Sequence, residues 1–183
     1  FSGLKELNPD CIGWIRFENI DISYPIMQGE DNEYYLKHTF EGQAVTAASI
    51  FMDANNHADF SDQNTFIYGH NMKDKTMFGK LNNYKDEEFY KENPYFYIYT
   101  PDGKVRMYKV FAASVVKDTS DAYNLTYNSD EEFESYLNLC RESSNYQVDV
   151  EVNAQSQIVS LSTCTNVKED ERFLLQGVLA GEY

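Results

Sequence analysis

Short apolar runs, separated by polar and turn-forming residues, follow one another along most of the chain. The runs are rich in Tyr, Phe, Val, Ile and Thr, the residue types that strands favour. The pattern predicts strands over Ile12–Phe17, Ile22–Met27, Ala48–Met52, Thr65–Tyr68, Tyr95–Thr100, Val105–Val116, Gln157–Cys164 and Arg172–Leu179. Asp102-Gly103 predicts a tight hairpin turn between the fifth and sixth runs. Many short strands with few helices indicate a mainly β protein, either a barrel or a sandwich.

The clearest helical pattern covers Asp130–Ser143. Ser129 and Glu132 have the spacing of a capping box, which satisfies the first backbone N–H groups of a helix. Four apolar residues at i, i+3, i+4 and i+7 then form one face: Phe133, Tyr136, Leu137 and Cys140. Cys140 is therefore expected in the core. Shorter helices are expected at Gly3–Asn8, Asp31–His38, Met77–Leu81 and Asp86–Glu92.

Composition fits one folded domain over 1–183. Hydrophobic residues make up 42% of the 183 positions and aromatic residues 15%, and neither a linker nor a repeat divides the chain. The formal charge of −15 disfavours binding to nucleic acids and to anionic membrane surfaces. No apolar run approaches the ~20 residues that cross a bilayer, and no signal peptide is evident. Phe1 does not look like a natural start, so we expect a membrane anchor upstream of it.

Cys164 is the cysteine whose surroundings suit chemistry. It ends an apolar run and precedes the polar stretch 166–171, which predicts a thiol at a strand end beside a loop. Strand alternation places Ser160 and Ser162 on its face. A thiol in such a place is commonly structural, and catalysis also needs an acid or base and a group that stabilises an oxyanion. The odd number of cysteines and their spacing favour neither a disulfide scaffold nor a metal cluster: Cys11, Cys140 and Cys164.

His70 and Arg172 are the candidate partners of Cys164. His70 follows the apolar run Thr65–Tyr68 and Gly69, which lets the backbone turn and expose the imidazole. Arg172 opens the run after Cys164, so it returns to the thiol if those two strands pair, and its guanidinium could donate to an oxyanion. An ion pair between Arg172 and an acidic residue of 169–171 is the structural alternative. His38 and His57 are expected at the surface.

Taken together and in order, these motifs resemble the sortase family. The stretch Ser160–Cys164 is similar to the family pattern Thr-Leu-x-Thr-Cys, with Ser in place of the first Thr, and Arg172 opens the next strand as in that family. Tyr68–Met72 supplies the upstream His. Asn8–Ile15 and the helix at 130–143 resemble class B sortases, so the likeness spans nearly the whole chain.

The resemblance implies a closed eight-stranded β-barrel with N-terminal helices, including the segment 1–10, and a helix at 130–143 inserted before the Cys-bearing strand. It implies a cysteine transpeptidase that cleaves a C-terminal sorting motif such as Asn-Pro-x-Thr-x after Thr and joins the new carboxyl to a cell-wall peptide amine. Cys164 would be the nucleophile, His70 the acid and base, and Arg172 the oxyanion donor. Ser162 and Thr163 would contact substrate. Sortases of this kind act at the outer membrane face of Gram-positive cells, on surface proteins and a peptidoglycan-precursor amine.

The residues leave two other functions open. A hydrolytic cysteine peptidase would use the same side chains with water as acceptor, although the motif that surrounds the Cys in papain-like enzymes is absent. A non-catalytic binding module would use the Tyr-rich loops as an interface. The stretch Asp53–His57 begins like an EF-hand loop, but Ala58 and Asn64 replace the Gly and Glu that the loop needs, so we reject an EF-hand. No metal and no cofactor are predicted.

Overall fold

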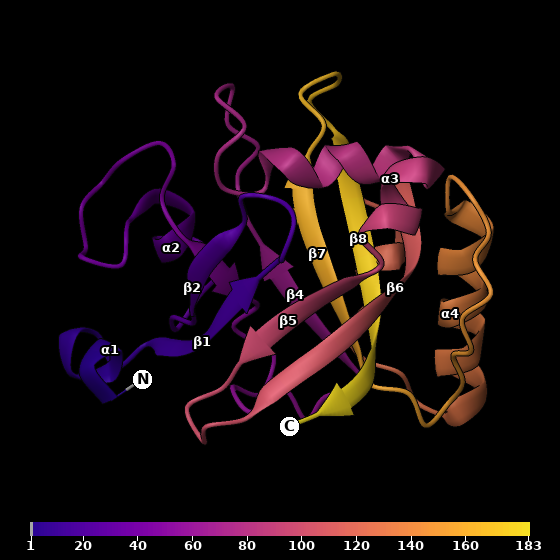
Figure 1. Ribbon diagram of the computed structural model, residues 1–183, viewed down its shortest axis with the longest axis horizontal. Helices are drawn as coiled ribbons and strands as arrows, with labels where there is room; N and C mark the ends of the chain where they lie inside the picture. The colour runs from indigo at the N-terminus through magenta and orange to yellow at the C-terminus, as the bar shows by residue number, and fades with distance from the viewer. Residues whose placement is uncertain (1) are drawn as a thin grey trace.

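The computed structural model describes residues 2–183 and contains a closed barrel of eight strands, as predicted (Figure 1). The strand order around the barrel is β1-β2-β3-β4-β7-β8-β6-β5, with β5 returning to β1. The strands are β1 (Cys11–Arg16), β2 (Ser23–Met27), β3 (Ile50–Met52), β4 (Asn64–Tyr68), β5 (Tyr95–Tyr99), β6 (Val105–Lys117), β7 (Ile158–Cys164) and β8 (Glu171–Glu182).

The barrel consists of two halves that meet along two seams. The first four strands make one half and the last four the other, and β1 pairs with β5 while β4 pairs with β7. The β4–β7 seam is parallel, as is the short β2–β3 pairing, whereas the other six pairings are antiparallel. The hairpin of β5 and β6 was predicted from its turn. The parallel pairings were not predicted, because no local pattern marks them.

The barrel interior is an apolar core to which every strand contributes. Alternate residues of β7, Val159 and Leu161, point into it, as do Phe173 and Leu175 of β8. Burying each such side chain contributes roughly 1.5–3 kcal/mol. The 3-10 helix η1 (Gly79–Lys85) and helix α3 (Glu87–Glu92) lie across one end of the barrel (Figure 1).

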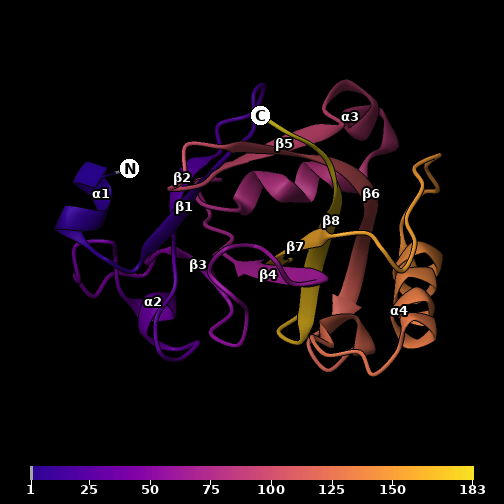
Figure 2. The same ribbon diagram turned by 90° about the horizontal axis from the view of Figure 1, so that it is seen from below.

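Helix α4 covers the outside of the barrel beside β6 (Figures 1 and 2). It spans Asp130–Ser143, as predicted, and Ser129 Oγ accepts from the N–H of Glu132 at 3.1 Å. The Glu132 carboxylate caps the N–H of Asn128 at 3.1 Å and not that of Ser129, so the capping box is displaced by one residue. The apolar face packs on residues of β6, β7 and β8, and Cys140 is buried in this second core, as predicted.

Two short helices lie on the opposite side of the barrel from α4 (Figures 1 and 2). They are α1 (Ser2–Leu7), within the expected helical segment 1–10 of which Phe1 lies outside the described residues, and α2 (Tyr34–Lys37). Among residues 2–183, no helix has the length and hydropathy needed to cross a membrane.

The helix predicted at Met77–Leu81 is wrong in its start and type. Lys75 and Met77 have positive φ angles of 68° and 56°, a backbone conformation that interrupts a right-handed helix. The chain instead makes a tight excursion over 71–77, closed by an isolated bridge between Asn71 and Met77, and enters the 3-10 helix at Gly79. A further 3-10 turn, η2 (Asp121–Tyr123), was not predicted.

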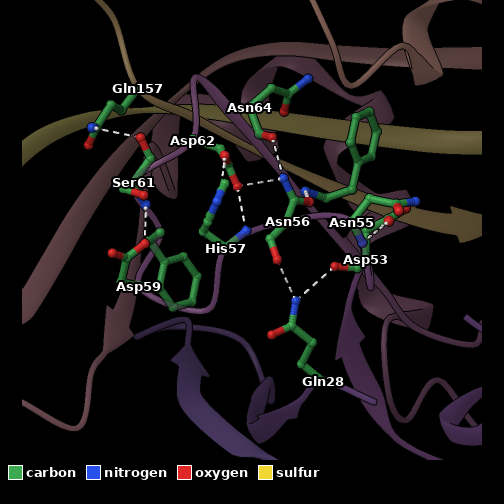
Figure 3. A network of polar contacts seen from close by, with 12 residues as sticks. Gln28, Asp53, Asn55, Asn56, His57, Asp59, Ser61, Asp62, Asn64 and Gln157 are labelled. Carbon is green, nitrogen blue, oxygen red and sulfur yellow. Dashed lines mark hydrogen bonds and ion pairs between the residues drawn. The ribbon is translucent and has the colours of Figure 1, made fainter. Parts of the chain in front are cut away.

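The loop that precedes β4 is held by its own polar network (Figure 3). Gln28 donates to the carbonyl oxygens of Asp53 and Asn56, and Asn56 donates in turn to Asp62 at 3.0 Å. The His57 ring contacts the Asp62 carboxylate at 2.7 Å. The polar groups of the EF-hand-like stretch thus bind neighbouring parts of the chain. These contacts fix the path along which the backbone enters β4.

Candidate active site

Cys164 is the last residue of β7, at the end of the barrel where two long loops project (Figure 1). Its side chain is half-buried, whereas Cys11 and Cys140 are buried. Its neighbour across the β7–β8 ladder is Arg172, so the expectation that these strands pair is correct. The pairing brings Arg172 back to the thiol although seven residues separate them in sequence.

A groove of about 820 Å³ opens beside Cys164. One wall comes from the loop after β4, with Asn71 and Met72, and the other from the β7–β8 loop, with Asn166 and Val167. These are the two loops that extend beyond the barrel end in Figure 1. Neither His70 nor Arg172 lines the groove.

His70 follows β4, and β4 is the direct parallel neighbour of β7. The Gly69 N–H donates to the carbonyl of Ser162 at 3.1 Å, which continues the ladder up to the residue before His70. Gly is required at 69, since a Cβ there would lie 2.6 Å from the Phe78 ring. The imidazole contacts the carbonyl oxygen of Leu36 in α2 through Nε2 at 2.8 Å. Within residues 2–183 no hydrogen bond joins this ring to the Cys164 thiol.

Arg172 is held by oxygen atoms of the β7–β8 loop and of the residue after β6. Its Nη1 donates to the carbonyl oxygens of Glu169 and Glu171 at 2.8 and 3.1 Å. Its Nη2 lies 3.6 Å from the carboxylate of Asp118. The structural alternative, an ion pair with an acidic residue of 169–171, is therefore wrong in its partner. Glu169 and Glu171 bind the guanidinium through their backbone carbonyls, and the paired carboxylate is that of Asp118.

Ser162 and Thr163 lie beside the nucleophile candidate but away from the groove. Both side chains are nearly fully buried, with 4% and 3% exposure. Ser162 Oγ shares a hydrogen bond of 2.7 Å with the hydroxyl of Tyr123 in η2, so this face of β7 is covered by a turn that the sequence pattern did not reveal. Substrate contact by Ser162 therefore requires Tyr123 to move, and Thr163 is as buried as Ser162.

Tyr123 is a candidate site residue that the sequence did not single out. Burial raises the pKa of its hydroxyl, which therefore stays protonated at neutral pH. The one signal in the sequence is Ser120, a capping residue type that precedes the short turn containing Tyr123.

The other two histidines lie elsewhere. His57 is exposed, as expected, and the neighbouring Asp62 carboxylate raises the pKa of its ring. His38 is at the surface, as expected, and is half-buried because its ring stacks on Tyr34 at 4.0 Å between ring centroids. Within residues 2–183, no three His, Cys, Asp or Glu side chains gather as metal ligands.

A sortase-domain family model matches residues 15–180 of this chain. The chain belongs to the sortase family. It is 38% identical to sortase B of Listeria monocytogenes over 180 residues, which cover 96% of this chain and 72% of that protein. It is 34% identical to sortase B of Staphylococcus aureus over 166 residues, which cover 90% of this chain and 67% of that protein. These relatives place this sortase in class B.

Solved sortase structures have the same barrel. The sortase B structure of Clostridium perfringens superposes with a TM-score of 0.93 at 30% identity, over 98% of this chain and 99% of that one. A Staphylococcus aureus sortase B–substrate complex superposes with a TM-score of 0.92 at 27% identity, over 98% and 84%. The protein is thus a cysteine transpeptidase of cell-wall sorting, of a class that acts in Gram-positive bacteria on surface-protein substrates and peptide amine acceptors.

Proposed function

We propose that this sortase cleaves a C-terminal sorting motif of the general form Asn-Pro-x-Thr-x after Thr and joins the Thr carboxyl to an amine of a cell-wall peptide. The main support is one observation: Cys164 opens onto a groove between two loops, directly across the β7–β8 ladder from Arg172. A thiol there can meet the carbonyl of a peptide laid along the groove.

In the first half-reaction, the Cys164 thiolate attacks the Thr carbonyl carbon and forms a C–S bond, while the carbonyl oxygen becomes an oxyanion. Arg172, with backbone N–H groups nearby, stabilises that charge. The guanidinium can do so by exchanging one of its bonds to the carbonyls of Glu169 and Glu171, which it makes through Nη1 alone. The oxyanion then collapses, the C–N bond breaks, and a thioester remains on Cys164.

His70 moves the protons in both half-reactions. With its Nε2 at the Leu36 carbonyl, Nδ1 is the ring nitrogen left to exchange a proton with the reacting groups. It protonates the departing amine, and later accepts a proton from the incoming amine as that nitrogen attacks the thioester. The C–S bond then breaks, and the thiolate is restored. If water attacks in place of the amine, the same thioester gives hydrolysis, so acceptor choice decides between transferase and thiol protease.

A quenched fluorescent sorting peptide, incubated with and without an amine acceptor such as triglycine, tests the proposal. We expect cleavage in both cases and a ligated product that increases with acceptor concentration. Cys164→Ala should abolish cleavage, whereas Cys140→Ala, a matched change to a buried thiol, should retain it. Free acid as the sole product at every acceptor concentration would support the hydrolytic alternative, and cleavage by Cys164→Ala would exclude the mechanism.

We further propose that the enzyme works at the outer face of the membrane, held there by an anchor upstream of Phe1. Fractionation of the full-length protein tests this, with protease accessibility of the barrel in intact, wall-stripped cells as the measurement. A protein released with the soluble fraction would contradict the proposed anchor.

A further inference from the structure

We propose that Asn71 is a positioning residue that fixes the backbone of His70 to the end of the Cys164 strand. The inference rests on the proposed function of Cys164 and His70. In this role, Asn71 touches neither the scissile bond nor the imidazole. It sets the distance between the Cys164 thiol and the His70 ring, which must act together.

Two side-chain hydrogen bonds tie the loop after β4 to the end of β7. Asn71 Nδ2 donates to the carbonyl oxygen of Cys164 at 2.8 Å. Asn166 Nδ2 donates in the opposite direction, to the carbonyl oxygen of Asn71 at 2.9 Å. Each asparagine side chain thus binds the main chain of the other segment, and the two bonds close a reciprocal clasp between loops that are far apart in sequence.

His70 lies between two fixed residues. On one side, the Gly69 N–H binds the Ser162 carbonyl at 3.1 Å, and on the other, Asn71 binds the Cys164 carbonyl. The carbonyl of His70 itself accepts from the N–H of Phe78 at 2.9 Å. Because the backbone is held before, at and after position 70, the Cα of His70 has little freedom relative to Cys164. Loss of the Asn71 side-chain bond would remove a direct tie between this side of His70 and β7, and leave the Asn166 bond and the bridge to Met77.

The two ends of the Asn71 amide have different surroundings. Its Nδ2 donates to the Cys164 carbonyl, whereas its Oδ1 is buried and has no hydrogen-bond partner among residues 2–183. This oxygen lies 3.1 Å from the point where a Cβ on Gly79 would be. A buried acceptor without a partner costs stability, so the contribution of this side chain comes from its donor to β7.

Asn166 adopts a backbone conformation that suits the clasp. Its φ is 63°, in the left-handed region that Asn tolerates better than most residues. This turn begins the β7–β8 loop two residues after Cys164 and directs the amide toward Asn71. Asn166→Gly keeps the left-handed conformation and removes the side-chain donor, so it tests the second bond with little backbone strain.

The test compares Asn71→Ala and Asn71→Asp with Asn82→Ala. Asn82 is a matched control, because its amide also donates to a backbone carbonyl, that of Gly79, and its Oδ1 is also buried without a partner among the described residues, but it does not touch β7. We expect kcat for peptide cleavage to fall about 10- to 100-fold in both Asn71 variants. KM should stay within about threefold, since Asn71 is one of ten residues that line the groove and the other nine are unchanged.

Asn71→Asp should be the more impaired variant, because its carboxylate oxygen faces the Cys164 carbonyl oxygen. Asn71→Gln, which keeps an amide donor, should recover part of kcat. Near-ultraviolet circular dichroism measures the folded fraction in each sample, and we expect that fraction to match the wild type. Iodoacetamide should also alkylate Cys164 alone, at the wild-type rate, because Cys11 and Cys140 stay buried in folded protein. Asn166→Gly should lower kcat by a smaller factor, and it carries the test if an Asn71 variant does not fold.

Three outcomes would overturn the inference. One is kcat at the wild-type level in the Asn71 variants. Another is an equal loss of kcat in Asn82→Ala, and the third is a loss of activity that only follows a loss of folded protein. Absence of activity in the wild type would instead refute the proposed function, so the two failures are distinguishable.

Discussion

Replacing Gly69 by Ala tests how closely the residue before His70 is packed. A Cβ at position 69 would lie 2.5 Å from Cδ1 of Ile50 and 2.6 and 2.8 Å from Cδ2 and Cγ of Phe78. The Ile50 methyl group can rotate away. The Phe78 ring cannot, because it is fully buried and its Cγ is bonded to Cβ, so rotation of the ring about that bond leaves Cγ in place. The chain must therefore shift at 69 or at 78.

The cost follows from overpacking. Inserting one methyl group into a filled core typically destabilises a protein by about 1–3 kcal/mol. For a chain of this size each kcal/mol lowers Tm by roughly 2–4 °C, so Gly69→Ala should lower Tm by about 2–12 °C. A shift of position 69 also moves His70, and a misplacement of about 1 Å can lower kcat by about a hundredfold.

Differential scanning calorimetry and steady-state peptide cleavage measure the two effects. Gly3→Ala is the control, because nothing lies within 4 Å of its Cβ and it sits in α1, where Ala is favoured by about 0.5–1 kcal/mol. We expect Tm to fall only for Gly69→Ala. A Gly69→Ala protein with unchanged Tm and kcat would show that the barrel end adapts freely, and would refute the packing argument.

Three further predictions concern the site and its supports. Arg172→Lys should lower kcat by about a hundredfold, because one ammonium cannot replace the planar guanidinium, and equal kcat values in this variant and the wild type would contradict the prediction. Asp118→Asn should change the free energy of unfolding by less than about 1 kcal/mol, since its ion pair with Arg172 is partly exposed. Cys140→Ser should lower stability by about 1–3 kcal/mol in urea titrations, since the hydroxyl is buried in an apolar cluster, and an unchanged midpoint would argue against that burial. Burial raises the pKa of Asp62, but hydrogen bonds from His57 and Asn56 outweigh it, so the folded pKa lies below the ordinary 3.8. Its ionised form thus contributes stability that is present above pH 3.8 and lost as the pH falls through the folded pKa. Asp62→Asn should flatten the fall of Tm below about pH 4, and a parallel fall in both proteins would refute this.

The strands and the inserted helix could be predicted because they depend on local patterns. β7 and β8 are runs of apolar residues with turn signals at their ends, and α4 follows from a 3.6-residue period and a Ser cap. The strand pattern indicated a barrel or a sandwich, and the likeness of Ser160–Cys164 and Arg172 to sortase motifs then predicted a closed barrel. The structure confirms that Arg172 pairs with Cys164, while the roles of Cys164, His70 and Arg172 stay predictions.

The remaining features depend on contacts between distant segments. No pattern near Asn64–Tyr68 states that β4 pairs in parallel with β7, because both partners are simply apolar runs. The carboxylate of Asp118 reaches Arg172 only through the pairing of β6 with β8. The face of Ser162 appeared free to meet substrate, since an alternating strand does not reveal the turn that covers it with Tyr123.

The parallel seam between β4 and β7 also governs when the enzyme can become active. His70 and Asn71 belong to the first half of the chain, and Cys164 and Arg172 to the last 20 residues. Neither half contains a complete site, and loop closure over this sequence distance is among the slow steps of folding. Under the proposed mechanism, a chain that is still emerging from a ribosome or a translocation channel has no reactive Cys164 thiol, and acyl transfer begins only after the C-terminal strand has docked. Because the β4–β7 seam closes late, the proposed reactivity of Cys164 is delayed until the whole barrel has folded.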